Sequence, residues 1–284
     1  MSEQSVIDAR QLAALLTDTK LVILDCRYDL ADKEAGARAF AEGHIPGARY
    51  ASLHQDLSAP LGRYGGRHPL PEAEQFQQFA RAAGIDTDSR VIVYDDQRLA
   101  FAARAWWLLR YFGHERVSIL DGGFSAWQNA GLPIAKGPAD PVSPGDFSAT
   151  PSPERLLDHT TIYRQLDNPP WQLVDARDAA RFAGTSEPID PIAGHIPTAI
   201  NKPWIGVTRE DGSLKSVGEL RAHWGDLPAD DLLANYCGSG VTACVNLFSL
   251  HLIGRDALLY PGSWSDWCAH IVYPETETAE KPAM

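Results

Sequence analysis

The chain has 284 residues, of which 44% are hydrophobic and 22% charged, and its formal net charge is −12. This length allows one large domain or two ordinary ones, each able to bury its own core. The acidic balance argues against a nucleic-acid partner or an anionic membrane surface, because both require a basic footprint. It does not exclude an anionic substrate, because local dipoles and a few arginines can outweigh a distant acidic surface.

The cysteines and the beginning of the chain bear on the compartment. Four cysteines stand at positions 26, 237, 244 and 268, without a CxxC pair or the dense spacing of a disulfide scaffold. Residues 1–16 lack a basic segment followed by an apolar one and a cleavage site, and no run approaches about 18 apolar residues. We therefore expect a soluble protein in a reducing compartment, the cytoplasm.

The first half of the chain is typical of strands that alternate with helices. Asp8 can cap a short amphipathic helix, and the run LVILDCR that follows it is typical of a buried strand. The turn GHIPGA at 43–48 precedes a strand start at Tyr50. The patterns after it predict a helix at 72–84, a strand at 91–96, a helix through 104–113, a strand at 117–120 and a short closing helix.

The same order of patterns recurs after residue 150. SPERLLDH predicts another helix start, QLVDAR another strand and GHIP another turn, LLANYC matches VIVYDD, and ALLYPGSWSDW matches SILDGGFSAW. Matches in several separate blocks indicate a duplication. We predict two similar α/β domains, each a mainly parallel sheet with helices on both faces: an N-terminal domain at 1–137, a proline-rich linker at 138–152 and a C-terminal catalytic domain at 153–284.

The stretch 232–250 carries the strongest signal for chemistry. LLANY predicts a strand, CGSGVTAC interrupts it with small residues, and VNLFSLHL resumes as a helix, so Cys237 stands at the carboxyl end of a strand and faces a helix start. Backbone N–H groups of such a loop can point inward, and the helix dipole adds positive potential. A thiolate is favoured there, which makes Cys237 the candidate nucleophile; a small buried hydrophobe is the alternative.

The duplication supplies an internal comparison for this loop. At the position of Cys237 the first half has Asp95, followed by DQRLAFAA in place of glycines and serine. Because that half has neither a thiol nor small residues, we expect no thiolate chemistry there. The N-terminal domain should cover the site and contribute side chains to it.

The two repeats, the GHIP turns, CGSGVTA and the string YPGSWSDW together resemble the tandem-domain sulfurtransferases of the rhodanese superfamily. The loop CGSGVT is similar to that of their 3-mercaptopyruvate branch, whereas the thiosulfate-using branch has basic residues where this chain has Gly238 and Ser239. The resemblance spans roughly residues 8–272. It implies that Cys237 takes sulfur from a small-molecule donor, 3-mercaptopyruvate, as a persulfide and passes it to a thiol such as thioredoxin or glutathione, or to cyanide.

The resemblance also implies roles for other residues. Ser239 and His44 match a serine and a first-domain histidine that act with an acid, for which Asp32 and Glu34 are candidates. His44 has an alternative as a turn histidine that bonds locally, like its counterpart His195.

Substrate contacts follow from the same resemblance. Arg181 matches an arginine that binds the donor carboxylate, with a surface salt bridge as the alternative. The loop residues Gly238, Gly240, Val241 and Thr242 would hold the substrate sulfur with their amides, although Thr242 can also be a plain helix cap. A second arginine of the mercaptopyruvate branch has no counterpart, because 186–195 contains no lysine or arginine. Thiosulfate therefore stays open as donor.

Other readings of the sequence are weaker. A cysteine phosphatase needs an arginine six positions after the cysteine, where this chain has Ala243. A non-catalytic sulfur carrier is a further alternative. Neither GxxxxGK nor GxGxxG nor a cluster with metal-ligand spacing occurs in the sequence, so we expect no nucleotide or metal cofactor.

Cys244 is expected in the core with a resolving role as the alternative, and five tryptophans are expected to pack in the core or between the domains: Trp106, Trp107, Trp127, Trp264 and Trp267.

Overall fold

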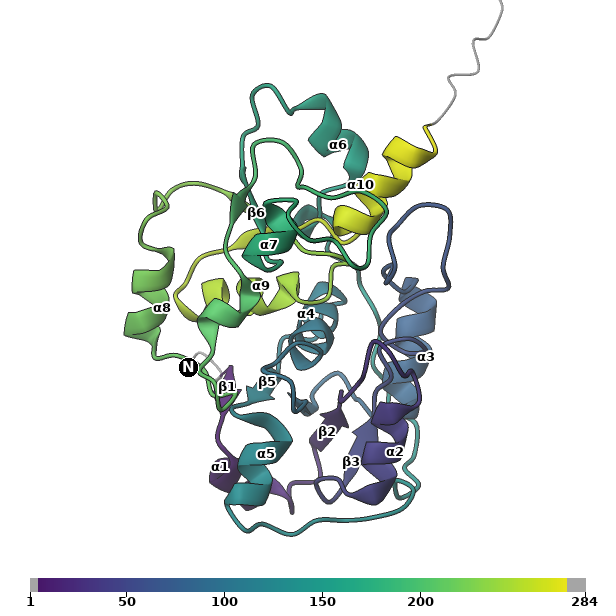
Figure 1. Cartoon of the computed structure of the whole chain (residues 1–284). Helices are drawn as coiled ribbons and strands as arrows, with labels where there is room; N and C mark the ends of the chain where they lie inside the picture. The colour runs from purple at the N-terminus through teal and green to yellow at the C-terminus, as the bar shows by residue number, and fades with distance from the viewer. Residues whose placement is uncertain (1–4, 275–284) are drawn as a thin grey trace, which may run out of the picture.

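The computed structural model describes residues 5–274 and contains two parallel sheets, one from each half of the chain (Figure 1). The first sheet has the strand order β1-β5-β4-β2-β3 and the second has β7-β6-β8-β9. All of their pairings are parallel. The predicted fold class of two similar α/β domains is confirmed.

The N-terminal domain follows the predicted order of elements. Its strands are β1 (Val6–Ile7), β2 (Leu21–Asp25), β3 (Ala48–Tyr50), β4 (Arg90–Tyr94) and β5 (Val117–Leu120). Its helices are α1 (Ala9–Leu15), α2 (Ala35–Glu42), α3 (Ala73–Ala82), α4 (Ala102–Tyr111) and α5 (Gly123–Asn129). As predicted, Asp8 caps α1, where its side chain accepts from the backbone N–H of Gln11 at 2.8 Å.

The C-terminal domain repeats this arrangement with a smaller sheet. Its strands are β6 (Gln172–Asp175), β7 (Ile200–Asn201), β8 (Leu233–Tyr236) and β9 (Ala257–Leu259). Its helices are α6 (His159–Arg164), α7 (Ala179–Phe182), α8 (Val217–Trp224), α9 (Ala243–Leu252) and α10 (Ser263–Val272), with short 3₁₀ turns η1 (Pro153–Arg155) and η2 (Trp204–Val207).

The helix expected at SPERLLDH begins later than predicted. Pro153–Arg155 forms only a 3₁₀ turn, and the α-helix starts after Asp158, whose side chain caps it by accepting from the N–H of Thr161 at 2.6 Å. A capping side chain and the extended backbone before it fix the helix start at this residue rather than at Ser152.

The two domains share one hydrophobic core. Helices α4 and α9, each following an inner strand of its own sheet, pack against each other in the middle of the molecule (Figure 1). Trp106 of α4 meets Phe248 of α9 edge to face, with ring centroids 4.9 Å apart. All five tryptophans expected to pack are buried. The interface therefore holds the loop before α9 rigidly against the N-terminal domain.

The segment between the domains is pinned to the first of them. Phe147 is buried in the shared core, and its backbone N–H donates to the carbonyl of Ile85 at 3.1 Å. Gly145 donates to Arg81 at 2.8 Å, and Thr150 donates to Phe112 at 2.9 Å. The domain boundaries expected from the sequence, with a first domain ending at 137, a linker ending at 152 and a second domain starting at 153, remain a prediction. The outer ends of the two domains, 1–4 and 275–284, lie outside the described residues.

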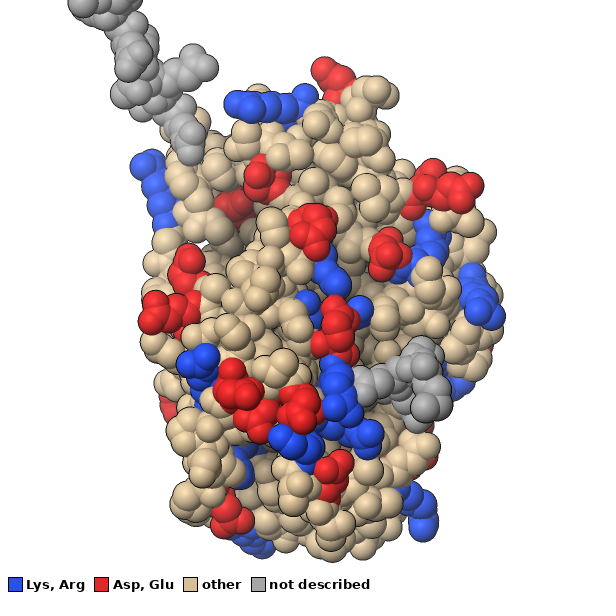
Figure 2. All heavy atoms as spheres, turned by 180° about the vertical axis from the view of Figure 1, so that it is seen from behind, with Lys and Arg blue, Asp and Glu red and all other residues tan. Residues whose placement is uncertain are grey.

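The surface carries both signs of charge. Figure 2 shows lysines and arginines interspersed with aspartates and glutamates on the rear face of the molecule. Among the described residues, 5–274, no helix is long and apolar enough to cross a bilayer. In the same part of the chain no three His, Cys, Asp or Glu side chains gather in a way that could hold a metal ion.

Candidate active site

Cys237 lies directly after β8 with its sulfur inside the loop that leads to α9. The side chain is 2% exposed. Burial alone would raise the pKa of this thiol, but the hydroxyl of Thr242 and the backbone N–H groups of Ser239, Ala243 and Gly240 donate to the sulfur and together lower the pKa below its ordinary value. The sulfur therefore lies among four hydrogen-bond donors of its own loop, and the role of Cys237 as nucleophile remains a prediction.

Two features of the loop differ from a plain helix start. Thr242 makes no capping hydrogen bond to the helix, and its hydroxyl donates a hydrogen bond to the sulfur of Cys237 instead. Gly240 has φ +76°, and a Cβ there would lie 2.2 Å from the carbonyl oxygen of Pro261. Both the left-handed backbone and the close carbonyl require glycine at this position.

The N-terminal domain has a cradle of the same kind, filled by its own side chain. Asp95 follows β4 as Cys237 follows β8, and its carboxylate accepts from the backbone N–H groups of Gln97, Leu99, Phe101 and Ala102 at 2.8–3.1 Å. The loop therefore binds an anion without glycine or serine residues. The side chain of Asp95 thus fills the position that the sulfur of Cys237 has in the other half, and this loop has no thiol, as the sequence shows.

A cavity of about 240 Å³ opens above the sulfur and is lined by both domains. The loop contributes Cys237, Gly238, Ser239, Val241 and Thr242. The N-terminal domain contributes Leu30, Arg67, Gln97, Ala100 and Phe101, and the rest of the C-terminal domain contributes Arg177, Asp178, Arg181, Ile189, Pro203, Trp204 and Ile205. The N-terminal domain thus covers the site, as the sequence predicts.

Sequence reasoning missed His68, the histidine that meets the loop. Its Nδ1 lies 2.8 Å from the hydroxyl oxygen of Ser239, and both side chains are buried. Burial, together with the positive charges of Arg104 and Arg67, lowers the pKa of His68 to about 3. The imidazole is therefore neutral at physiological pH and can exchange a proton with the serine hydroxyl.

His44, the histidine expected in this role, lies elsewhere. Its Nδ1 is 2.8 Å from the carbonyl oxygen of Phe40, and its ring stacks on the Phe40 ring with centroids 3.8 Å apart. His195 repeats this arrangement on Phe182, with Nδ1 2.8 Å from the carbonyl oxygen and the rings 3.9 Å apart. His44 is therefore a turn histidine that bonds locally, as the alternative had it. The histidine that lies beside Ser239 is His68.

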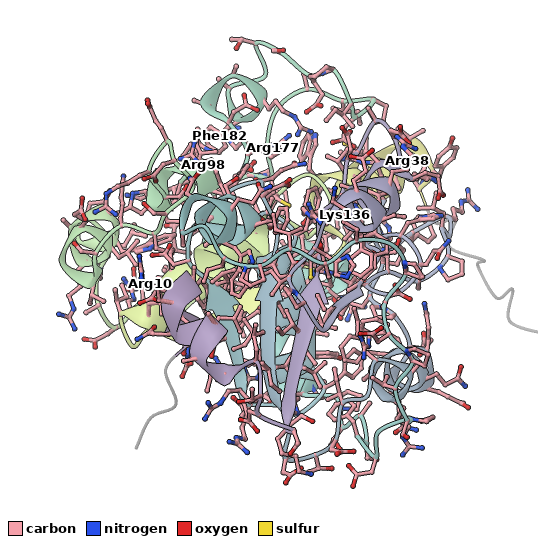
Figure 3. All side chains as sticks on the ribbon, turned by 90° about the horizontal axis from the view of Figure 1, so that it is seen from below. Arg10, Arg38, Arg98, Lys136, Arg177 and Phe182 are labelled. Carbon is pink, nitrogen blue, oxygen red and sulfur yellow. The ribbon has the colours of Figure 1, made fainter. Side chains whose placement is uncertain are left out.

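The acids proposed as partners of that histidine are also remote from the cavity. Asp32 is exposed and forms an ion pair of 2.5 Å with Arg38, and Glu34 is an exposed residue at the start of α2. Figure 3 shows Arg38 at the edge of the molecule, away from Arg177, which lines the cavity. Neither acid contributes to the cavity wall.

Arg181 of α7 lies at the cavity, and its contact with the donor carboxylate remains a prediction. Its guanidinium borders the cavity, and its two terminal nitrogens would stand 3.4 Å from a Cβ at Gly238. Two buried carboxylates hold it: Glu187 at 2.9 Å and Asp190 at 2.9 Å. Arg177 shares Glu187 at 3.1 Å, and its own main partner is Asp175 at 2.6 Å. These arginines are fixed before any substrate binds.

Arg104 is a buried cation behind the loop. It is 0% exposed, and its guanidinium donates to four backbone carbonyls: Gly240 at 3.1 Å, His68 at 3.1 Å, Leu57 at 3.3 Å and Pro69 at 3.4 Å. Among residues 5–274 it forms no ion pair with a carboxylate. One side chain of the N-terminal domain therefore ties the cysteine loop to the backbone of His68.

The other cysteines are structural. Cys26, Cys244 and Cys268 are buried and unpaired. Burial raises the pKa of Cys244 to about 12 and that of Cys268 to about 11. Both therefore stay as thiols, in agreement with the core position predicted for Cys244.

The chain belongs to the family of rhodanese-like domain proteins, and the family model matches it twice, at residues 8–130 and 158–270. It is 46% identical over 274 residues to the probable 3-mercaptopyruvate sulfurtransferase of Pseudomonas aeruginosa, covering 94% of this chain and 96% of the relative. It is 41% identical to the putative thiosulfate sulfurtransferase SseB of Mycobacterium tuberculosis, covering 95% and 96%.

Solved structures agree with this assignment. The structure of the 3-mercaptopyruvate sulfurtransferase from Leishmania major superimposes with a TM-score of 0.84 at 32% identity, covering 95% of this chain and 76% of that one. The tandem rhodanese fold and the sulfurtransferase class predicted from sequence are confirmed. A protein of this class has a sulfur donor and a sulfur acceptor as its substrates.

Proposed function

We propose that this protein transfers sulfur from 3-mercaptopyruvate to a thiol or to cyanide through a persulfide on Cys237. The observation that carries the proposal is the thiol of lowered pKa at the floor of a cavity that also presents Arg181. A thiolate is the nucleophile that can attack the sulfur of the donor, and a guanidinium fork binds a carboxylate through two parallel hydrogen bonds. The similarity to the Pseudomonas and Leishmania enzymes supports this donor.

In the first step the Cys237 thiolate attacks the thiol sulfur of the donor. A sulfur–sulfur bond forms, the carbon–sulfur bond breaks, and its electron pair stays with carbon as the enolate of pyruvate, which then takes up a proton. The loop amides that hold the thiolate would hold the outer sulfur of the persulfide once it ionises. In the second step an acceptor thiolate, such as that of thioredoxin or glutathione, or cyanide attacks this outer sulfur, and the Cys237 thiolate leaves.

Ser239 and His68 suit the proton transfer of the first step. Ser239 lines the cavity beside the sulfur, and its hydroxyl is bonded to a neutral imidazole. Such a pair can donate a proton to the enolate as it forms and recover it afterwards from the persulfide or from solvent.

A second donor has an observation in its favour. The Mycobacterium relative is named a putative thiosulfate sulfurtransferase at 41% identity over 280 residues, so thiosulfate is the alternative donor with the same persulfide.

The state of the cysteines bears on the compartment, because all four of them are unpaired. Because free thiols persist in reducing compartments, we place the reaction in the cytoplasm.

Steady-state rates with the two donors test the proposal. The purified protein should form pyruvate from 3-mercaptopyruvate in many turnovers per active site, with a higher kcat/KM than for thiocyanate formation from thiosulfate and cyanide. A single stoichiometric burst would indicate a sulfur carrier instead. A clear preference for thiosulfate would overturn the choice of donor, and hydrolysis of phosphate esters would overturn the class of chemistry.

Replacing His68 by glutamine should lower kcat for mercaptopyruvate by on the order of 10²-fold, because general acid–base groups contribute at least that much. The matched control is His195→Gln, which changes the same residue type at an exposed position with a local backbone contact. Stopped-flow measurement of pyruvate release separates the first step from the second. Equal rates in the two variants would show that His68 takes no part in proton transfer.

A further inference from the structure

Ser263 is a buried serine at the start of α10, and its hydroxyl bridges two backbone groups next to the nucleophile. The backbone N–H of Cys237 donates to Oγ of Ser263 at 3.1 Å, and the hydroxyl donates to the carbonyl oxygen of Tyr260 at 2.9 Å. The serine is 0% exposed. Because a buried N–H without a partner is costly, this hydroxyl fixes the direction of the N–H of Cys237.

The backbone of Ser263 lies in the left-handed region, with φ +56°. Residues with a side chain adopt this conformation rarely, and holding one there costs free energy that the surrounding structure must supply. Glycine would adopt it without that cost. A serine in a backbone position that suits glycine therefore indicates that its side chain has a use there.

The N-terminal domain has glycine at the equivalent position. Gly123 has φ +57°, and a Cβ there would lie 2.0 Å from the carbonyl oxygen of Asp95. In that domain the N–H of Phe124 donates to the carbonyl of Asp95 at 2.8 Å. In the other domain the N–H of Trp264 donates to the carbonyl of Cys237 at 3.0 Å. The two helix starts hold equivalent carbonyls, and in the domain with the thiol a side chain holds the N–H of the same residue as well.

The start of α10 thus fixes the backbone of the cysteine loop at several points. The N–H of Ser265 donates to the carbonyl of Gly238 at 3.0 Å, in addition to the contacts at the N–H and the carbonyl of Cys237. A fixed backbone on both sides of the Cα atom determines where the side chain of Cys237 points. It therefore determines how the sulfur meets the hydrogen-bond donors of its loop.

We propose that Ser263 is a positioning residue for the nucleophile, whose hydroxyl holds the backbone of Cys237 so that the sulfur lies among the hydrogen-bond donors of its loop. This inference rests on the proposed sulfurtransferase function, since it concerns the nucleophile of that same site. Ser263 is not part of the cavity wall, so it acts through Cys237 and not on the donor. Loss of the hydroxyl should therefore affect kcat more than KM.

The test compares Ser263→Ala and Ser263→Gly with the wild type. Both variants lack the hydroxyl, but only glycine relieves the left-handed backbone. We expect kcat for mercaptopyruvate to fall by about ten- to a hundredfold in both, because a buried N–H loses its acceptor, with a smaller change in KM. Alkylation of Cys237 by iodoacetamide should begin at higher pH in both variants. Ser263→Gly should nevertheless unfold at a higher temperature than Ser263→Ala.

Ser249→Ala is the matched control. Ser249 lies farther along α9 and is also 0% exposed. Its hydroxyl accepts from the indole N–H of Trp224 at 3.0 Å and donates to the carbonyl of Asn246 at 2.8 Å. The control therefore loses a buried bridging hydroxyl of the same kind. Its unfolding temperature should fall, but its kcat and its alkylation profile should match those of the wild type.

The outcomes separate a positioning role from a merely structural one. If the hydroxyl only stabilises the fold, activity will follow stability, and Ser263→Gly will recover the kcat and the alkylation profile that Ser263→Ala loses. That result would overturn the proposal, as would wild-type values in both variants of Ser263 or an equal loss of kcat in Ser249→Ala. Failure of the wild-type protein to turn over either donor would overturn the proposed function instead, and the alkylation profile, which needs no donor, would still test Ser263.

Discussion

Cys237→Ser should abolish sulfur transfer with either donor, with a loss in kcat on the order of 10⁴ or more, as when the nucleophile of another covalent enzyme is removed. The loop amides stabilise a thiolate, but a serine hydroxyl does not ionise in them at neutral pH and cannot form a sulfur–sulfur bond. Mass spectrometry of the wild-type protein treated with mercaptopyruvate should show a gain of one sulfur on the peptide that contains Cys237. The serine variant should show none.

Cys244→Ser is the matched control for this experiment. Cys244 is also buried beside the loop, where its thiol lies 3.4 Å from the carbonyl oxygen of Gly240, but burial raises its pKa to about 12. Its replacement should leave the sulfur gain on Cys237 and most of the turnover intact. Turnover that survives Cys237→Ser, or that is lost only in Cys244→Ser, would contradict the assignment of the nucleophile.

The cysteine loop could be predicted because its signal is local. A strand, a run of small residues and a helix follow each other within 232–250, and parallel sheets place such loops at the carboxyl ends of their strands. Arg181 could be placed through the family resemblance. Both belong to the domain that carries the nucleophile, so no knowledge of how the two domains pack was needed.

His68 and Arg67 could not be predicted in the same way. They stand in a loop without helix or strand pattern, and they reach the site only because α4 packs on α9 and the loop docks on the start of α10. The family resemblance led to His44, in the first GHIP turn, instead. A histidine repeated in both halves, of which one half has no nucleophile, is better explained by a structural role, and its stacking on Phe40 bears this out.

The anion-binding backbone of the Asp95 loop could not be predicted from the residue types in that loop. Its sequence lacks the glycines and serine of the catalytic loop, yet it gathers backbone N–H groups around an anion in the same way. Arg98 and Leu99 adopt positive φ values of 58° and 71° there. The cradle is thus a property of the fold at this point of the sheet, and the two domains differ in the side chain that fills it.

Arg104→Met should make the thiolate of Cys237 less stable relative to the thiol, although Arg104 does not line the cavity. A buried guanidinium without a carboxylate partner is costly unless another negative charge faces it. Burial lowers the pKa of Arg104, while negative charge on Cys244 and, next to it, on Cys237 opposes this and favours the charged form; of the two thiols, only that of Cys237 has a lowered pKa. By reciprocity Arg104 favours the thiolate, so its removal should raise the pKa of Cys237 and lower kcat/KM at neutral pH by on the order of 10².

The rate of alkylation by iodoacetamide, measured against pH, reports this change directly. In Arg104→Met the rise in rate should occur at higher pH than in the wild type, while in Arg104→Lys, which keeps the charge but not the planar fork, it should move less. Arg67 also carries a positive charge toward Cys237, and His68 is neutral, so a part of the thiolate stabilisation remains in every variant. An unchanged pH profile in folded Arg104→Met would show that Arg104 only supports the loop backbone.

The same coupling predicts a pH-dependent contribution to stability. Because the folded pKa of Cys237 is lowered, its ionisation stabilises the fold above the ordinary thiol pKa near 9.0, and this stabilisation is lost as pH falls through the lowered value. The difference in free energy of unfolding between the wild type and Cys237→Ser should therefore increase with pH across that window. In the Arg104→Met background the increase should be smaller, since the buried cation that faces the thiolate is gone; equal slopes in both backgrounds would disprove the coupling.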